Sequence, residues 1–413
     1  MKYFLYCIVL LSFICQSLNG QDDGSAGFDN GFYIQSDDGS FVFRPFGLIH
    51  TDLRILSNSM QINSDETQAS TFLVRRLRFG FEGTLYNKID YDLETNIGNA
   101  GAEIIFAWIN LGYLPEAQIR IGQFKEPFNY EVLLPEKYLD FIERSMAAVV
   151  ISPAEDIGVM IHNFGSPCEN FFEYGIGVFN GLGGSALKND PEKTFEYTGR
   201  IAVYPFVLSS NILNKIRIAG SVLYEDNKPE AVELHQRTPL GFEFFPEIMT
   251  EGKRFSFGSD IQWICGPFSL KAAYIQDQGG RNISQISNVD VVTEGWHIDA
   301  TYLITGEDKV LKMKSGLEVA GRFEKLNVDA GAPFTIVGYT DVQGNPITLQ
   351  KNDVTTVTMG LNYYLNYNIK FQMNYQVNWF GNDLLTPSSR TGDILKTADD
   401  LHGIFLARVQ LFF

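Results

Sequence analysis

The feature that most constrains the fold is a two-residue alternation of apolar and polar side chains that recurs in short segments from residue 41 onward. Residues 369–380 show it best. One side carries Ile369, Phe371, Met373, Tyr375, Val377 and Trp379, and the other carries Lys370, Gln372, Asn374, Gln376 and Asn378. A period of two predicts β-strands. An apolar exterior around a polar interior is typical of a barrel in lipid and is the reverse of a soluble barrel.

The breaks between these segments add a second regularity, because long and short breaks alternate. Long polar stretches follow residues 56, 225, 277, 327 and 380, whereas residues 87–88, 114–116 and 265–267 are tight turns. A soluble β-sandwich also alternates in side-chain character but gives no reason for this pattern. We therefore expect an all-β, transmembrane antiparallel outer-membrane barrel of about sixteen strands, with long extracellular loops and short periplasmic turns. A barrel of this size leaves a water-filled lumen.

Residues 401–413 are predicted to be the closing strand of the barrel. Every second residue from Phe413 back to Leu401 is apolar or glycine, and the opposite face is only partly polar. We expect this strand to pair with the first strand, near residues 43–53, and Ile404 and Leu406 on its inner face to need cover. The terminal aromatic residue resembles the assembly signal of bacterial outer-membrane barrels. An ordinary C-terminal strand of a soluble sandwich is the alternative for this segment alone.

The chain divides into three predicted regions. Residues 1–20 have an early lysine, an apolar run and a polar close, which indicates a secretory signal peptide. Residues 21–40 are expected to be a periplasmic N-terminal segment, and residues 41–413 a single barrel. No later stretch is apolar over the roughly 18 residues that a membrane helix needs. The formal net charge of −17 argues against a nucleic-acid partner.

Basic residues on the predicted strands are expected to face the lumen. An arginine that faces lipid at the bilayer midplane costs about 2–4 kcal/mol, so the strand at residues 72–86 is expected to turn Arg76 and Arg78 toward the lumen. The alternation then places Arg75 on the lipid-facing row. The same assignment places further cations inward: Arg120, Arg200, Arg217, Arg322, Lys370 and Arg408. Acidic residues are also assigned inward. Two interpretations remain open, a mesh of ion pairs that stiffens the wall and an anion path lined by uncompensated cations.

Residues 125–153 are too apolar for an exposed loop. We expect this segment to fold into the lumen as a constriction loop. Lys125, Lys137 and Arg144 are expected to line the opening, and Glu126, Glu136, Asp140 and Glu143 to offset part of their charge. A lid or a subunit contact over the outer rim is the alternative.

Several motifs in the N-terminal half resemble the phosphate-selective porin O and P family. They are residues 75–83 (RRLRFGFEG), 122–128 (GQFKEPF), 143–145 (ERS), 153–162 (PAEDIGVMIH), 174–181 (YGIGVFNG) and 199–206 (GRIAVYPF). The resemblance implies a sixteen-stranded trimeric channel whose basic residues guide phosphate or polyphosphate. It carries Arg76, Arg78, Lys125, Arg144 and Arg200 over as pore-lining residues.

The expected function is passive diffusion of small hydrophilic solutes, chiefly anions such as phosphate or polyphosphate, across the bacterial outer membrane. The expected partners are the lipid bilayer, lipopolysaccharide, inorganic anions and two further copies in a homotrimer. The alternatives are a general non-selective porin, a structural barrel plugged by its own loops, and an outer-membrane hydrolase that uses His162 or His297. The five histidines are scattered and lack metal-ligand spacing, so no metal, cofactor or enzymatic activity is expected.

Overall fold

The computed structural model describes residues 25–413 except 30, 57–59, 62–66, 69, 99–101, 167–170, 182, 184–194, 241–242, 284–285, 341–345 and 382–401. The predicted signal peptide and Cys168 lie outside the described residues. Among the helices of the described part, none has the length and hydropathy that crossing a membrane requires.

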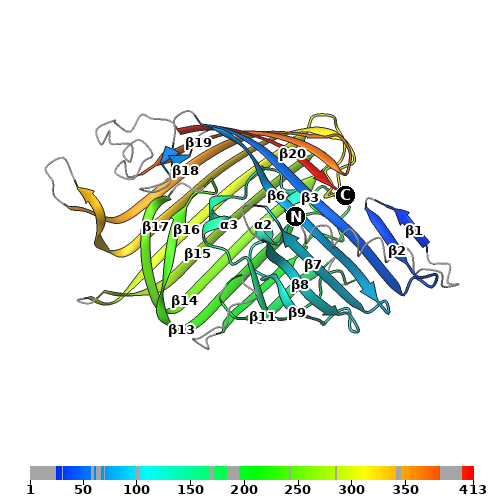
Figure 1. Ribbon diagram of the computed structural model, residues 1–413, viewed down its shortest axis with the longest axis horizontal. Coiled ribbons are helices and arrows are strands. Elements are labelled where there is room, and N and C mark those ends of the chain that lie inside the picture. The colour runs from blue at the N-terminus through cyan, green and yellow to red at the C-terminus, as the bar shows by residue number, and fades with distance from the viewer. Residues whose placement is uncertain are drawn as a thin grey trace, which may run out of the picture.

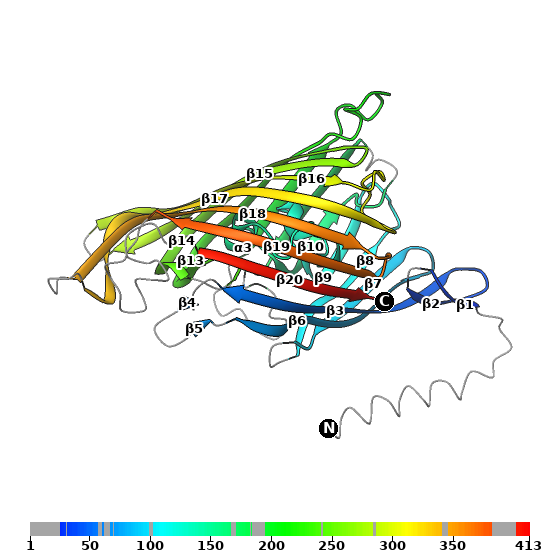
Figure 2. The same ribbon diagram turned by 90° about the horizontal axis from the view of Figure 1, so that it is seen from above.

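One antiparallel sheet closes on itself to form the barrel (Figures 1 and 2). Of its 18 described strands, all but the N-terminal pair form the wall, so the wall has sixteen strands. They are β3 (Phe41–Leu56), β6 (Thr71–Leu85), β7 (Ile89–Asn96), β8 (Glu103–Leu111), β9 (Gln118–Lys125), β10 (Glu155–His162), β11 (Phe172–Phe179), β12 (Glu196–Val203), β13 (Arg217–Arg237), β14 (Glu243–Cys265), β15 (Phe268–Ile283), β16 (Ile286–Leu303), β17 (Gly316–Thr340), β18 (Pro346–Tyr364), β19 (Ile369–Phe380) and β20 (His402–Phe412).

Closure is made by the last strand, as the sequence predicts. β20 pairs antiparallel with β3, from Ile404 opposite Leu56 to Phe412 opposite Leu48. Gly47 and Phe413 extend the ladder, because each donates its backbone N–H to the carbonyl oxygen of the other at 2.8 and 3.1 Å. The barrel fold is therefore confirmed.

Four short strands lie outside the wall. β1 (Ser25–Phe28) and β2 (Phe32–Gln35) form a hairpin whose second strand pairs with the start of β3 (Figure 1). β4 (Met60–Gln61) and β5 (Thr67–Gln68) pair with each other. The hairpin occupies much of the segment predicted to precede the barrel.

The predicted faces of the strands are confirmed where the alternation is clear. On β19, Phe371 and Tyr375 are 40% and 51% exposed, whereas Asn374 is 2% exposed. Apolar side chains therefore face outward and amides face the lumen. β20 follows the same rule, with Val409 outside and Arg408 buried inside.

The prediction that Arg75 lies on the lipid row is wrong. A β-bulge interrupts the pairing of β3 with β6, so that His50 opposes Arg76 while Thr51 opposes Val74. The extra residue, Arg75, turns into the barrel, where its Nε donates to Glu143 at 3.0 Å. A bulge breaks the alternation because two residues of one strand face one residue of the other.

The two rims differ in length. β13 to β18 are long strands that extend the wall on the extracellular side, at the left of Figure 1. Periplasmic connections such as residues 86–88 and 266–267 are tight, and residues 204–216 and 304–315 form longer ones.

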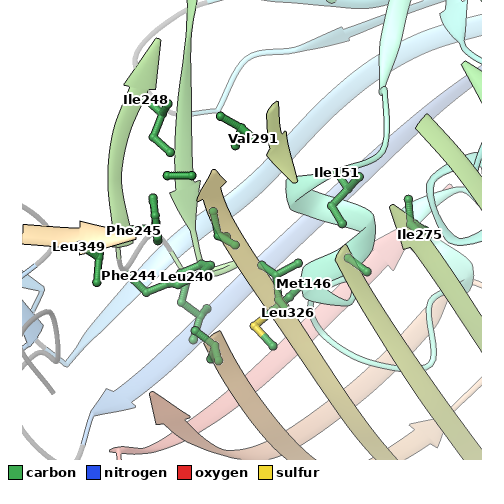
Figure 3. Packing of buried hydrophobic residues seen from close by; sticks show 14 of the residues in the cluster. Met146, Ile151, Leu240, Phe244, Phe245, Ile248, Ile275, Val291, Leu326 and Leu349 are labelled. Carbon is green, nitrogen blue, oxygen red and sulfur yellow. The ribbon is translucent and has the colours of Figure 1, made fainter. Parts of the chain in front are cut away.

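Residues 126–154 connect β9 to β10 and fold inside the barrel. They form α2 (Tyr130–Leu133), a 3₁₀ turn η1 (Glu136–Tyr138) and α3 (Met146–Val150). Met146 and Ile151 pack with Ile275 and Leu326 of the wall (Figure 3). The same apolar cluster includes Phe244, Phe245 and Ile248 near the extracellular rim, and Ile404 and Leu406 of β20. The two β20 residues thus have the cover that their position demands.

Candidate functional site

The loop at residues 126–154 owes its shape to two capped helical turns. The Asn129 side chain accepts hydrogen bonds from the backbone N–H of Glu131 and Val132 at 2.7 and 3.3 Å. The Ser145 hydroxyl accepts one from Ala148 at 3.3 Å. Asparagine and serine are favoured at this position because their oxygens satisfy the free N–H groups of the first turn. The caps fix which loop carboxylates face the wall.

Glu143 is the first of these anchors, and four arginines surround its carboxylate. The nitrogens of Arg75, Arg408, Arg54 and Arg76 lie 3.0, 3.5, 3.7 and 4.0 Å from its oxygens. Burial alone would raise the pKa of Glu143, but the charges of Arg75, Arg76 and Arg408 outweigh burial and lower this pKa to about 2. The carboxylate therefore stays ionised near neutral pH and ties the loop to β3, β6 and β20.

Arg408 also holds the barrel seam. Its Nε and Nη2 donate to the two carboxylate oxygens of Asp52 at 2.7 and 2.8 Å, across the β20–β3 pairing. Its remaining donor binds the Ile142 carbonyl at 2.6 Å. A bidentate pair of this kind is stronger than a single neutral hydrogen bond.

Glu136 is the second anchor. Arg78 donates to both of its oxygens at 3.0 and 3.1 Å, and Arg144 donates to one at 3.1 Å. Burial raises the pKa of Glu136, while Lys125, Arg144 and Arg78 together hold it well below its usual range. Arg144 also donates hydrogen bonds to the backbone carbonyls of Glu131 and Leu134, both at 2.9 Å. It therefore stabilises the loop from within.

The third contact faces β15 to β17. Arg322 forms a bidentate pair with Asp299 at 2.9 and 2.8 Å and donates to Glu131 of the loop at 2.6 Å. Asp140 of the loop binds Lys271 and Lys309 at 2.6 and 2.8 Å. A cavity of only about 30 Å³ separates the loop from this wall. Such a space holds about one or two water molecules.

The wall at β12 to β14 carries another compensated set. Arg200 lies 2.7 Å from Asp260 and donates to the Phe128 carbonyl at 2.6 Å. Arg217 lies 2.6 Å from Glu173 and 3.4 Å from Asp260.

Three of the ten predicted cations make no ion pair within 4.0 Å with a carboxylate of the described part of the chain: Arg120, Lys125 and Lys370. Lys370 donates to the backbone carbonyls of Lys137 and Leu139 at 3.1 and 2.9 Å, so it also anchors the loop. The other seven fit the interpretation of an ion-pair mesh. Arg120 and Lys125 are left for the interpretation of an anion path, and Lys125 also donates to the Leu134 carbonyl of the loop at 3.4 Å.

Arg120 and Lys125 lie on β9 and border a cavity of about 720 Å³ in the lumen that we call the vestibule. The Arg120 guanidinium lies 4.2 Å from the centre of the Trp108 ring and 5.7 Å from that of Phe124. Gly122 pairs with Trp108, and a Cβ at Gly122 would lie 2.7 Å from the Trp108 Cα, so only glycine fits. Periplasmic residues Tyr204 and Lys215 also line the vestibule, which therefore reaches the periplasmic side.

The sequence placed Glu136 and Glu143 at the constriction but did not identify Arg75 or Trp108 as parts of the site. The apolar character of residues 125–153 indicates that the loop packs, but it does not reveal which wall residue each carboxylate meets. The aromatic residues of β8 had a detectable signal, since Phe106 and Trp108 stand two residues apart and so share one strand face.

The histidines that a hydrolase would use, His162 and His297, both form hydrogen bonds in the described part of the chain. No group of three or more His, Cys, Asp or Glu side chains there is arranged to hold a metal ion. His162 lies 2.8 Å from the Asn110 amide oxygen, and His297 lies 3.0 Å from Asp299. Neither histidine forms a hydrogen bond with a serine among the contacts that the structure describes.

Comparison with known proteins agrees with the fold. The family model described as "Phosphate-selective porin O and P" matches residues 47–378, which is most of the chain. No curated protein matches the sequence significantly.

Solved structures similar to the barrel include OmpT of Vibrio cholerae in a trimer form, with a TM-score of 0.56, 11% identity, and coverage of 91% of this chain and 100% of that chain. The outer membrane channel DcaP of Acinetobacter baumannii has a TM-score of 0.56 and 11% identity, with coverage of 94% and 100%. An anion-selective porin from Comamonas acidovorans has a TM-score of 0.54 and 12% identity, with coverage of 90% and 100%. At these identities the likeness concerns the fold alone.

Proposed function

Because the chain belongs to the phosphate-selective porin O and P family and forms a sixteen-stranded barrel of the bacterial outer membrane, we propose that it is a porin for passive diffusion of small hydrophilic solutes, with a preference for anions such as phosphate. The observation that carries the anion preference is the vestibule, where Arg120 and Lys125 face open space without an ion pair to a described carboxylate.

The loop at residues 126–154 is the constriction of this channel. Its carboxylates Glu136 and Glu143 are held by cations of the wall, and its apolar side chains pack against the opposite wall. The predicted pore-lining cations then divide by role. Arg76, Arg78, Arg144, Arg200, Arg217, Arg322, Lys370 and Arg408 position the loop and the wall, and Arg120 and Lys125 attract the anion.

The attraction between an anion and these two cations is weak enough for the anion to pass through the channel. Opposite charges about 4 Å apart attract by about 4 kcal/mol at an effective dielectric constant of 20, which concentrates an anion and still allows release. The test is the reversal potential of the purified protein in a planar bilayer under a salt gradient. The proposal requires anion selectivity, and cation selectivity would sink it.

A second candidate function, a barrel plugged by its own loops, is favoured by the apolar cluster on the extracellular side. Phe244, Phe245 and Leu240 are at most 3% exposed and belong to the same apolar cluster as Met146 of the loop (Figure 3). A plugged barrel would show negligible conductance in the same bilayer, whereas a porin conducts on insertion.

The remaining assignments follow from the same premise. The outward apolar band contacts the lipid bilayer and lipopolysaccharide, and the assembly is a homotrimer, which the trimeric form of the similar Vibrio cholerae OmpT supports.

A further inference from the structure

The vestibule wall is aromatic as well as basic. Five partly exposed aromatic side chains line it, Phe106, Trp108, Tyr130, Phe164 and Tyr204, and they come from β8, the constriction loop and two periplasmic connections. A small inorganic anion keeps its hydration shell and makes no use of such a surface. Ligand pockets with mostly apolar linings and a few placed polar groups bind organic molecules.

Arg120 is held in an orientation that leaves its donors available. Its guanidinium carbon lies over the Trp108 ring, 4.2 Å from the ring centre. A contact with a ring face does not use up the N–H groups of a guanidinium, which point outward in its own plane. The Arg120 Nε makes no hydrogen bond with any described residue. A stacked guanidinium with free edges is suited to bidentate binding of a carboxylate or phosphate.

The local charge favours an anion. The vestibule is lined by four cations, Arg120, Lys125, Lys215 and Arg217, and by two carboxylates, Asp92 and Glu173. Glu173 is occupied by Arg217 at 2.6 Å. Asp92 is therefore the one carboxylate of the described vestibule lining left to balance Arg120, Lys125 and Lys215.

We propose that the vestibule is a binding subsite for organic anions, namely a phosphate or carboxylate group on a flat apolar body. Arg120 and Lys125 bind the anionic group, and Phe106 and Trp108 contact the apolar body. This inference rests on the proposed porin function and narrows its substrate class from anions in general to anions with an aromatic or similar body.

The test is isothermal titration of the full barrel in detergent with two probes of related charge, phenyl phosphate and inorganic phosphate. Phenyl phosphate is expected to bind at least about tenfold more tightly, because part of its ring is removed from water. Arg120→Gln should weaken both probes, while Trp108→Leu should lower the ratio of their affinities. Trp379→Leu, at a lipid-facing tryptophan that is 42% exposed, is the matched control and should leave the ratio unchanged.

Each outcome decides the inference. Three results would overturn it: equal affinity for the two probes, no binding of phenyl phosphate, or an effect of Trp379→Leu on the affinity ratio as large as that of Trp108→Leu. The reversal potential is measured separately, so the two proposals fail independently. Anion selectivity with equal affinities sinks the subsite alone, and cation selectivity with tight phenyl phosphate binding sinks the anion-porin proposal alone.

Discussion

Replacing Glu143 by glutamine probes how the constriction loop is held. The substitution preserves size and removes the charge that Arg75, Arg408, Arg54 and Arg76 share at 3.0 to 4.0 Å. Removing one partner of a buried ion pair costs about 3–5 kcal/mol, because the remaining charges stay buried without compensation. We expect that cost to fall on loop docking, since the strand ladders do not involve Glu143.

The assay for Glu143→Gln is single-channel recording combined with thermal unfolding in detergent. The loop should leave its docked position more often, so the mean conductance and the current noise should rise, while the barrel keeps its β-sheet circular dichroism. Glu116→Gln is the matched control because Glu116 is exposed in a periplasmic turn. Unchanged conductance and noise in Glu143→Gln would refute the assignment of Glu143 as an anchor of the constriction.

The other predictions concern the same wall. Arg120→Gln with Lys125→Gln should lower the anion-to-cation permeability ratio, whereas Lys88→Gln in an exposed periplasmic turn should leave it unchanged; equal ratios in all three proteins would count against the vestibule. Arg76→Ala with Arg78→Ala should change selectivity less than the Arg120 and Lys125 pair does, because these arginines already face carboxylates, and should raise conductance by loosening the loop. The docked loop lowers the pKa of Glu143 from about 4.5 to about 2, so the stabilisation that Glu143 gives to docking is fully present above pH 4.5 and is lost as the pH falls toward 2. Conductance recorded from pH 7 to pH 3 should therefore rise only below about pH 4.5. A rise already at pH 6 would show that protonation of Glu143 does not cause it.

The barrel could be predicted from sequence because lipid outside and water inside impose a period of two on every strand. β19 follows that rule along its length, and the sequence also indicates that β20 closes onto β3. Arg75 could not be placed, since a bulge depends on how two strands pair and leaves no mark on one strand alone. The role of Glu143 was equally hidden, because its partners Arg54 and Arg408 come from opposite ends of the chain.

The predicted anion site shows the same limit. Eight cations were assigned to it from strand phase and two, Lys125 and Arg144, from the apolar loop, and neither pattern tells which of them meet a carboxylate. Seven do so, and Lys370 is used by loop carbonyls. The remaining two, Arg120 and Lys125, share β9 and border the vestibule. They differ from the other eight cations because of how the strands and the loop assemble.

The reversal potential in a salt gradient tests the central claim most directly. The wild-type protein should conduct on insertion and give a potential of the sign set by anion flow, and Arg120→Gln with Lys125→Gln should move that potential toward zero. A potential of the opposite sign, or a barrel that inserts and carries no current, would contradict an anion-preferring porin.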